Sequence, residues 1–126
     1  MTRTNNMNNE KYILDEDGNV VSESDLLKWA RWFETSKDQR IVARTDLKDV
    51  HVSTVFLGLD YNFGFGGKPL LWETLVFENK LSTEEIMGHA FTFHKTVDTY
   101  GERYHTKDEA ITGHMLIVAK LTNNND

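Results

Sequence analysis

The chain has 126 residues, of which 39% are hydrophobic and 27% charged, and its formal net charge is −6. This length fits one domain, and this composition excludes an intrinsically disordered chain. No apolar run approaches the roughly 20 residues of a membrane helix, the first ten residues lack the apolar stretch of a signal peptide, and the chain has no cysteine. We therefore expect a cytoplasmic protein that lies outside membranes and has no disulfide bond.

Acidic residues outnumber basic ones, 20 to 14, and both are scattered along the chain. Because Lys and Arg form no cluster, the chain lacks the charge with which proteins neutralise a phosphate backbone. The acidic residues are not massed either, as imitation of DNA toward a basic protein would require. The charge therefore predicts a solvated surface and argues against nucleic acid as a partner.

The organised part of the chain is expected to be one domain, residues 11–121, between flexible tails at 1–10 and 122–126. Near its start, short apolar runs flank Asp17 and Gly18. This pair suits a hairpin turn, because both central positions of such a turn need positive φ.

An amphipathic helix is predicted next, near residues 23–34. Ser22 with Asp25 forms a capping signal at its start. Apolar residues follow at helical spacing, and these are Leu26, Trp29, Ala30 and Phe33. One face of this helix is therefore suited to a core.

Alternating and β-branched residues predict three strands in the middle of the chain. The segments RIVARTDL and VHVSTVFLGL, joined by a turn at Lys48 and Asp49, predict the first two. The third, LLWETLVF, follows a loop with three glycines, the only proline and the aromatic residues Tyr61, Phe63 and Phe65. This connection, called the glycine loop below, is too long for a tight hairpin and has room for structure of its own.

The last third of the chain repeats a pattern, Glu-x-Ile-x-Gly-His, at residues 84–89 and 109–114. Each copy follows a capping box, so both copies predict helices. The two boxes are Ser82 with Glu85 and Thr106 with Glu109. Between them, TYGERYHT predicts a short strand. Two capped helices resemble one another easily, so coincidence explains the repeat better than duplication does.

These elements predict an α+β fold: an antiparallel sheet of four to five strands packed by two or three helices. The helices near 23–34 and 106–121 are expected to cover one face of the sheet. The alternation of residues in the strands supports this arrangement, because antiparallel sheets commonly bury one face only.

The glycine loop resembles a phosphate-binding loop in composition only. A Walker loop needs glycine where Asn62 stands and Ser or Thr where Pro69 stands, and the dinucleotide fingerprint needs a third glycine and a following helix. The acidic turns DEDGN and DYNFG do not continue into an EF-hand. No cofactor is therefore predicted.

The five histidines form no metal-binding motif, since none sits in His-Glu-x-x-His and no cysteine completes a zinc cluster. His89 and His94 would point apart on a helix. His114 is flanked by apolar residues, and we interpret it as a hydrogen-bonded or half-buried histidine. The glycines before His89 and His114 weaken a helix by up to ~1 kcal/mol relative to alanine, which indicates close packing against another element.

Two carboxylates are candidates for chemistry. Glu73 lies in an otherwise apolar strand, where burial would disfavour its charged form unless Arg44 or Arg103 pairs with it. An ion pair is the favoured interpretation, and a general base or a ligand anchor is the alternative. Asp60 and Asn62 are expected to hydrogen-bond the backbone at the entrance of the glycine loop.

Three segments, VSTVFLGLDYNFG, PLLWETLVF and ERYHTKDEAITGH, resemble a family of small proteins encoded by bacteriophages. In that family, a Val-Ser-Thr-x-Phe-Leu-Gly-Leu-Asp strand precedes a glycine loop, a Pro-Leu-Leu-Phe-Glu-Thr strand and an Arg-Tyr-x-Thr segment that opens a Gly-His helix. The resemblance covers roughly residues 40–120. Trp72 stands where the family commonly has Phe or Tyr, and the segment 79–100 is longer than usual.

The resemblance implies a setting, the cytoplasm of an infected host, rather than an activity. Small phage accessory proteins often inhibit host defence systems, either by blocking a protein or by sequestering a signalling nucleotide. This analogy concerns the class of protein and names no particular ligand.

Two functions from different classes follow. In the first, the protein is not an enzyme and binds a host defence protein or a nucleotide-like molecule through aromatic stacking and charge pairing; self-association stays open. The candidate binding residues are Arg44, Asp60, Tyr61, Asn62, Phe63, Phe65, Lys68, Glu73 and Arg103. In the second, a small hydrolase or transferase uses Glu73 or Asp60 with a histidine. We favour binding, because no clustered acid and base is evident.

The aromatic residues of the glycine loop have two open roles. In an extended segment, alternating residues project to opposite sides, so one side could anchor the loop while the other meets a ligand beside Lys68. Alternatively, all three rings are buried in the core. The first role predicts that Phe65→Ala weakens binding, and the second predicts that it destabilises the fold.

Overall fold

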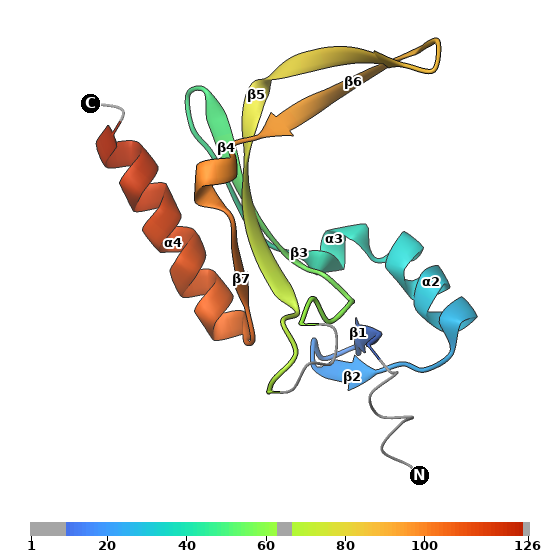
Figure 1. Cartoon of the computed structure of the whole chain (residues 1–126). Helices are drawn as coiled ribbons and strands as arrows, with labels where there is room; N and C mark the ends of the chain where they lie inside the picture. Colours follow the sequence, from blue (N-terminus) through green and yellow to red (C-terminus); the bar gives the residue numbers. More distant parts are fainter. Residues whose placement is uncertain (1–9, 63–66, 125–126) are drawn as a thin grey trace.

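The computed structural model describes residues 10–62 and 67–124, which form the predicted α+β fold with antiparallel sheets (Figure 1). The predicted N-terminal tail lies outside these ranges except for Glu10, as do residues 125 and 126. None of the helices in the described ranges is long and apolar enough to cross a membrane.

Two sheets organise the chain. The smaller pairs β1 (Tyr12–Leu14) with β2 (Val20–Ser22). The larger has five strands in the order β3-β4-β5-β6, with β7 also paired to β5. Its strands are β3 (Ile41–Asp46), β4 (Val50–Phe56), β5 (Trp72–Ile86), β6 (His89–Thr96) and β7 (Glu102–Tyr104). The helices are α2 (Leu26–Thr35), α3 (Lys37–Arg40), the 3-10 helix η1 (Asp98–Tyr100) and α4 (Lys107–Asn124).

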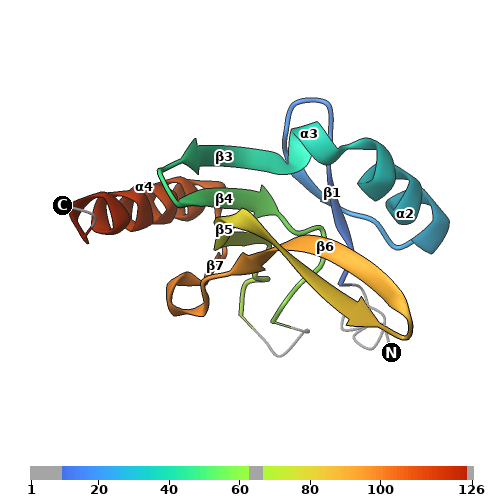
Figure 2. The same ribbon diagram turned by 90° about the horizontal axis from the view of Figure 1, so that it is seen from above.

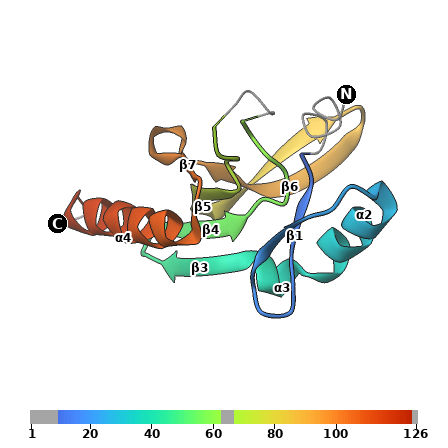
Figure 3. The same cartoon turned by 90° about the horizontal axis from the view of Figure 1, so that it is seen from below.

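The first hairpin forms as its turn residues predict. Asp15 Oδ1 accepts hydrogen bonds from the backbone N–H groups of Asp17 and Asn19, and Gly18 has a φ of 85°. In Figure 3 this hairpin lies beside α2 and α3. The indole Nε1 of Trp29 donates both to the carbonyl of Tyr12 in β1 and to the carbonyl of Gly58, which follows β4 of the larger sheet.

Helix α2 begins one turn later than its predicted range. Asp25 is its N-cap, whereas Ser22, the other residue of the predicted capping pair, lies in β2. Asp25 Oδ1 accepts hydrogen bonds from the backbone N–H groups of Leu27 and Lys28, which satisfies donors that have no partner inside the helix. Trp32 then packs its ring edge against Phe56, with 5.9 Å between the ring centroids. The apolar face of α2 therefore contributes to the core at one end of the sheet.

β5 is the longest strand, with 15 residues, and it connects the parts of the larger sheet. Its first half pairs with β4 on one edge and with β7 on the other. Its second half pairs with β6, and η1 interrupts the edge between β6 and β7. Beyond Glu78, where β4 ends, β5 and β6 continue as a two-stranded ribbon that leaves the body (Figures 1 and 2). We call residues 79–96 the arm.

The helix predicted at 84–89 is wrong, because these residues form the tip of the arm. Glu84 pairs with Phe91 and Ile86 with His89 across the ribbon. Met87 and Gly88 form the turn with φ values of 54° and 83°, the combination that two-residue hairpins require. The glycine here is a turn residue, and its Cβ position has open space around it, so close packing does not explain it.

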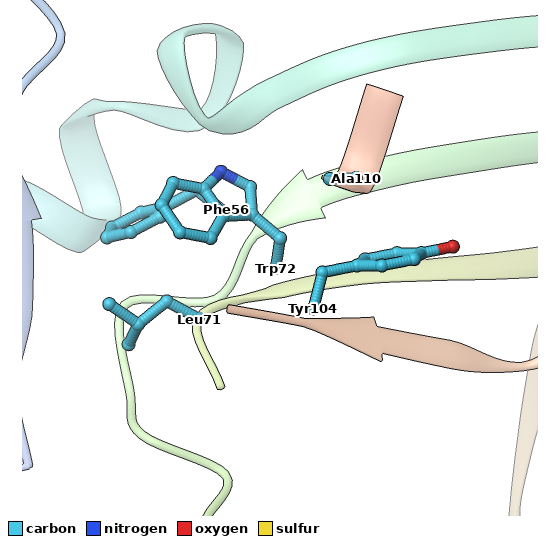
Figure 4. Close-up of a cluster of buried hydrophobic side chains, with 5 residues drawn as sticks. All are labelled: Phe56, Leu71, Trp72, Tyr104 and Ala110. Atoms are coloured by element: carbon cyan, nitrogen blue, oxygen red, sulfur yellow. The ribbon is translucent and has the colours of Figure 1, made fainter. Parts of the chain in front are cut away.

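The core lies between the sheet and α4. One cluster, near the start of α4, contains Phe56, Leu71, Trp72, Tyr104 and Ala110 (Figure 4). A second, near the end of α4, contains Val52, Val76, Ile117 and Leu121. A Cβ at Gly113 would overlap the Tyr104 ring, so this glycine allows α4 to approach β7. The packing predicted for this glycine is confirmed.

Candidate functional site on the open face of the sheet

Residues alternate between two faces along β4 and β5. Val52, Thr54 and Phe56 on β4 are fully buried beneath α4, whereas Ser53 and Val55 are half-buried. The strand register places Arg44, Ser53 and Leu75 side by side, and beside them Val55, Glu73 and Arg103. We call these six residues the open face, because none of them is buried.

An ion pair stacked on an aromatic ring occupies one side of the open face. Arg103 Nε donates to Glu73 Oε2 at 2.9 Å, between directly paired residues of β7 and β5. The guanidinium carbon lies 4.6 Å from the ring centroid of Tyr61, within the range of a cation–π contact. The predicted ion pair of Glu73 is confirmed, with Arg103 as its partner. The structure thus brings three predicted site residues together.

Arg44 lies on the same face but belongs to a separate pair. Both Nε and Nη2 of Arg44 donate to Asp46 Oδ1, at 3.2 and 3.1 Å. Both side chains of this pair are more than half exposed, so solvent screens the pair and it adds little to stability. Arg44 is therefore accessible to a partner. It does not pair with Glu73, which was one of the two predicted alternatives.

The remaining candidates divide between anchoring and exposed roles. Asp60 is 7% exposed, and its Oδ1 accepts hydrogen bonds from the backbone N–H groups of Asn62 and Leu70. It therefore holds the two ends of the glycine loop together, as predicted for turn chemistry. Lys68 is exposed. Phe63 and Phe65 lie outside the described residues, so their binding role stays a prediction.

A chain of hydrogen bonds crosses the opposite, α4-covered face of the sheet, and the sequence did not predict it. His114 Nε2 lies 2.8 Å from the Thr45 hydroxyl, and its Nδ1 lies 2.8 Å from the Thr54 hydroxyl. Thr54 bonds Thr74, and Tyr104 donates to Thr74 at 3.1 Å. The chain thus links α4 to β3, β4, β5 and β7.

The hydrogen bonds of His114 suit a neutral imidazole, which donates with one ring nitrogen and accepts with the other. His114 can therefore donate to one of the hydroxyls of Thr45 and Thr54 and accept from the other. Both hydrogen bonds of the ring are made without a second proton. Burial lowers the pKa of His114 below its ordinary value, because the cation would be poorly solvated there. The prediction of a hydrogen-bonded histidine is confirmed.

Metal binding and acid–base chemistry find little support at these positions. Within residues 10–62 and 67–124, no group of three or more His, Asp or Glu side chains could hold a metal ion. The hydrogen bonds of His114 go to two threonines, and those of Asp60 include backbone N–H groups. Both residues therefore have structural partners where the hydrolase hypothesis places reactive ones.

The arm is the surface feature that sequence reasoning missed. Four of its apolar side chains are exposed, and these are Leu81, Ile86, Met87 and Phe91. A signal was present in the pair Met-Gly between two runs with alternating residues, which favours a hairpin. The capping box at Ser82 and Glu85 indicated the opposite.

Comparison of the chain with models of protein families, with curated proteins and with solved structures found no match.

Proposed function

We propose that this protein acts by binding another protein with its open face, and that it performs no catalysis. In the setting that the resemblance to phage proteins implies, the partner is a component of a host antiphage defence system, and binding inhibits that component. The observation that carries this proposal is the accessible stack of Arg103 on Tyr61, paired with Glu73.

The residue types on the open face are those that dominate protein interfaces. Arginine and tyrosine are enriched among the residues whose truncation costs most binding energy, particularly where a rim of other contacts excludes water. Val55 and Leu75 supply half-buried apolar surface next to the stack. The Glu73 contact holds the guanidinium of Arg103 in place, which lowers the entropy that a partner would otherwise have to remove.

A protein partner fits this face better than a nucleotide does. A phosphate group at either arginine would lie beside a carboxylate, because Arg103 is paired with Glu73 and Arg44 with Asp46. The negative charges of these carboxylates repel a phosphate and offset the attraction of the guanidinium groups. A protein surface can instead add an acidic or aromatic side chain to the existing pairs.

The proposal is tested by affinity capture from lysates of bacteria in which the phage grows, followed by mass spectrometry. We expect the wild-type chain to retain one host protein, and the open-face variants Arg44→Ala and Arg103→Lys to retain at least about tenfold less of it, as hot-spot substitutions do. Arg31→Ala changes an exposed arginine on α2 and should retain the wild-type amount.

Two results would contradict the proposal. In one, the open-face variants capture the same protein as well as the Arg31→Ala control does. In the other, the purified wild-type chain turns over a nucleotide substrate, and the turnover disappears in Glu73→Gln. Circular dichroism of each variant confirms that the comparison is made between folded proteins.

A further inference from the structure

The arm has the pairing of a regular ribbon but lacks the packing that normally supports one. Six successive residue pairs join β5 to β6, from Leu81 with His94 to Ile86 with His89. The N–H of Asn79 donates to the carbonyl of Asp49 at 2.9 Å, and beyond it no further strand of the described chain lies on that edge of β5. Two-stranded ribbons are marginally stable by themselves in water.

The tip of the arm exposes an apolar side chain, and a recess lies at the base. At the tip, Met87 is 93% exposed. At the base, beside the edge of β5 where pairing with β4 stops, lies a recess of about 630 Å³. Its lining combines the apolar side chains of Val50 and Val97 with Lys48, Asp49, Glu78, Asn79 and Lys80. An unbranched apolar side chain such as methionine fits an irregular recess of this kind.

The charged residues along β5 also favour contact between the tip of one arm and the base of another. Lys80 lies at the base of the arm, whereas Glu84 and Glu85 lie close to the tip, and all three are exposed. A parallel neighbour with this sequence would place like charges together, which is unfavourable across strands. An antiparallel copy would instead place Lys80 close to the glutamates of its neighbour.

We propose that two copies of this chain associate through their arms, with the β5 edges paired antiparallel about a two-fold axis. Centred on Thr83, this pairing places Lys80 opposite Ile86 of the second copy and on the same face as its Glu84, two residue pairs away, within reach of a long side chain. Met87 of each copy then reaches the base recess of the other. The two ribbons become one four-stranded sheet, which supplies the third and fourth strands that each arm lacks.

The size of the arm limits the affinity. A standard interface involves roughly 20 to 30 residues on each side, and residues 80–96 are fewer than that. The bodies carry the two arms in opposite directions, so they add little contact. We expect a dissociation constant on the order of micromolar, as for small interfaces at the weak end of the range.

Sedimentation velocity of the purified full chain tests the association directly. From about 1 to 500 μM, a range that brackets a micromolar constant, we expect a shift from monomer to dimer. A chain that stays monomeric throughout this range would overturn the proposal. This measurement needs no host protein, so its failure is separate from a failure of the open-face proposal.

Charge reversal tests the antiparallel pairing. Lys80→Glu and Glu84→Lys each bring like charges together in a homodimer and should each weaken it by about tenfold or more. A mixture of the two variants pairs every Glu with a Lys, so a heterodimer should form at concentrations where each variant alone is monomeric. If the single reversals dimerise like the wild type, or if the mixture stays monomeric, the pairing is wrong.

A truncation at the tip tests the recess. Met87→Ser removes the apolar side chain that enters it and should weaken the dimer by about tenfold, as the loss of a buried anchor does. Leu27→Ser is the matched control, since Leu27 is 75% exposed on α2, and it should leave the dimer unchanged. Equal effects of the two substitutions would refute the role of Met87. Circular dichroism checks that each variant is folded.

Discussion

Residues 84–89 and 109–114 share the pattern Glu-x-Ile-x-Gly-His, yet the first copy forms the tip of the arm and the second forms part of α4. In α4, Ala110 and His114 are four residues apart and almost fully buried against the sheet. The corresponding residues of the first copy, Glu85 and His89, are polar and exposed. A helix at 84–89 would therefore place two polar residues at the positions that α4 buries, and helices in proteins depend mainly on the burial of an apolar face.

The glycines of the two copies show the same difference. Gly113 lies against the ring of Tyr104, whereas Gly88 has nothing near its Cβ position and adopts a φ of 83°. The same residue type thus serves close packing in one copy and backbone freedom in the other. A short sequence pattern leaves this choice open, and the surrounding chain decides it.

Substitution of the two histidines should reveal the largest difference in stability between the two copies. His114→Ala leaves the hydroxyls of Thr45 and Thr54 without their partner and creates a cavity, so we expect a loss of about 3 kcal/mol in the free energy of unfolding. His89→Ala removes an exposed side chain and should change it by less than about 0.5 kcal/mol. Urea denaturation measures both values. Similar losses for the two variants would show that the hydrogen-bond chain adds little.

Substitution of the two glycines should reveal the next largest difference in stability. Gly113→Ala forces the Tyr104 ring or α4 to move, and overpacking of this kind costs about 1 to 3 kcal/mol. Gly88→Ala places alanine at positive φ, which costs about 1 kcal/mol, and this cost falls on the arm rather than on the core. The free energy of global unfolding should therefore fall more in Gly113→Ala than in Gly88→Ala. A Gly113→Ala variant as stable as the wild type would mean that α4 moves aside without cost.

The sequence predicted the elements whose signals are local. The turn at Asp17 and Gly18, the cap at Asp25 and the alternation in β4 depend on residues within a few positions of one another, and all three are confirmed. The pairing of Glu73 with a cation could also be predicted from the sequence, because a carboxylate in an apolar strand requires a cation.

The sequence did not predict features that depend on distant partners. The arm exists because residues of β5 pair with residues of β6, and the capping signal at Ser82 was stronger than the hairpin signal at Met87 and Gly88. The hydrogen-bond chain at His114 joins residues up to 69 positions apart. Single threonines in strands give no sign that they share one histidine.

Substitution in the two predicted capping boxes should produce a smaller difference in stability. In α4 the box is formed, since Thr106 Oγ1 accepts from the N–H of Glu109 and Glu109 Oε1 accepts from the N–H of Thr106. Thr106→Ala should therefore cost about 1 kcal/mol. Ser82 lies in a strand opposite Phe93, so Ser82→Ala should cost almost nothing in thermal or urea unfolding. A cost at Ser82 as large as that at Thr106 would contradict the assignment of these two roles.

The smallest expected effect is a pH dependence that comes from His114. Its pKa is lowered in the folded state, so below about pH 6.5, the ordinary value for histidine, the unfolded chain binds a proton that the folded chain resists. The contribution to stability is therefore fully present above that pH and is lost as the pH falls toward the folded-state pKa. Between pH 7 and pH 6 the loss from one such group is at most about 0.7 kcal/mol. Protonation of the ring also removes its single acceptor nitrogen, so the threonine hydroxyl that donates to it must turn around.

The chain contains four other histidines and 20 Asp and Glu residues, so the wild-type curve alone does not isolate His114. His114→Gln keeps a polar side chain but does not titrate, and it serves as the reference. Urea unfolding of both proteins from pH 7.5 to pH 5.5 should show a steeper loss of stability in the wild type than in His114→Gln. Parallel curves for the wild type and His114→Gln would mean that the imidazole accepts its second proton at no cost, and that the hydrogen-bond chain does not hold it neutral.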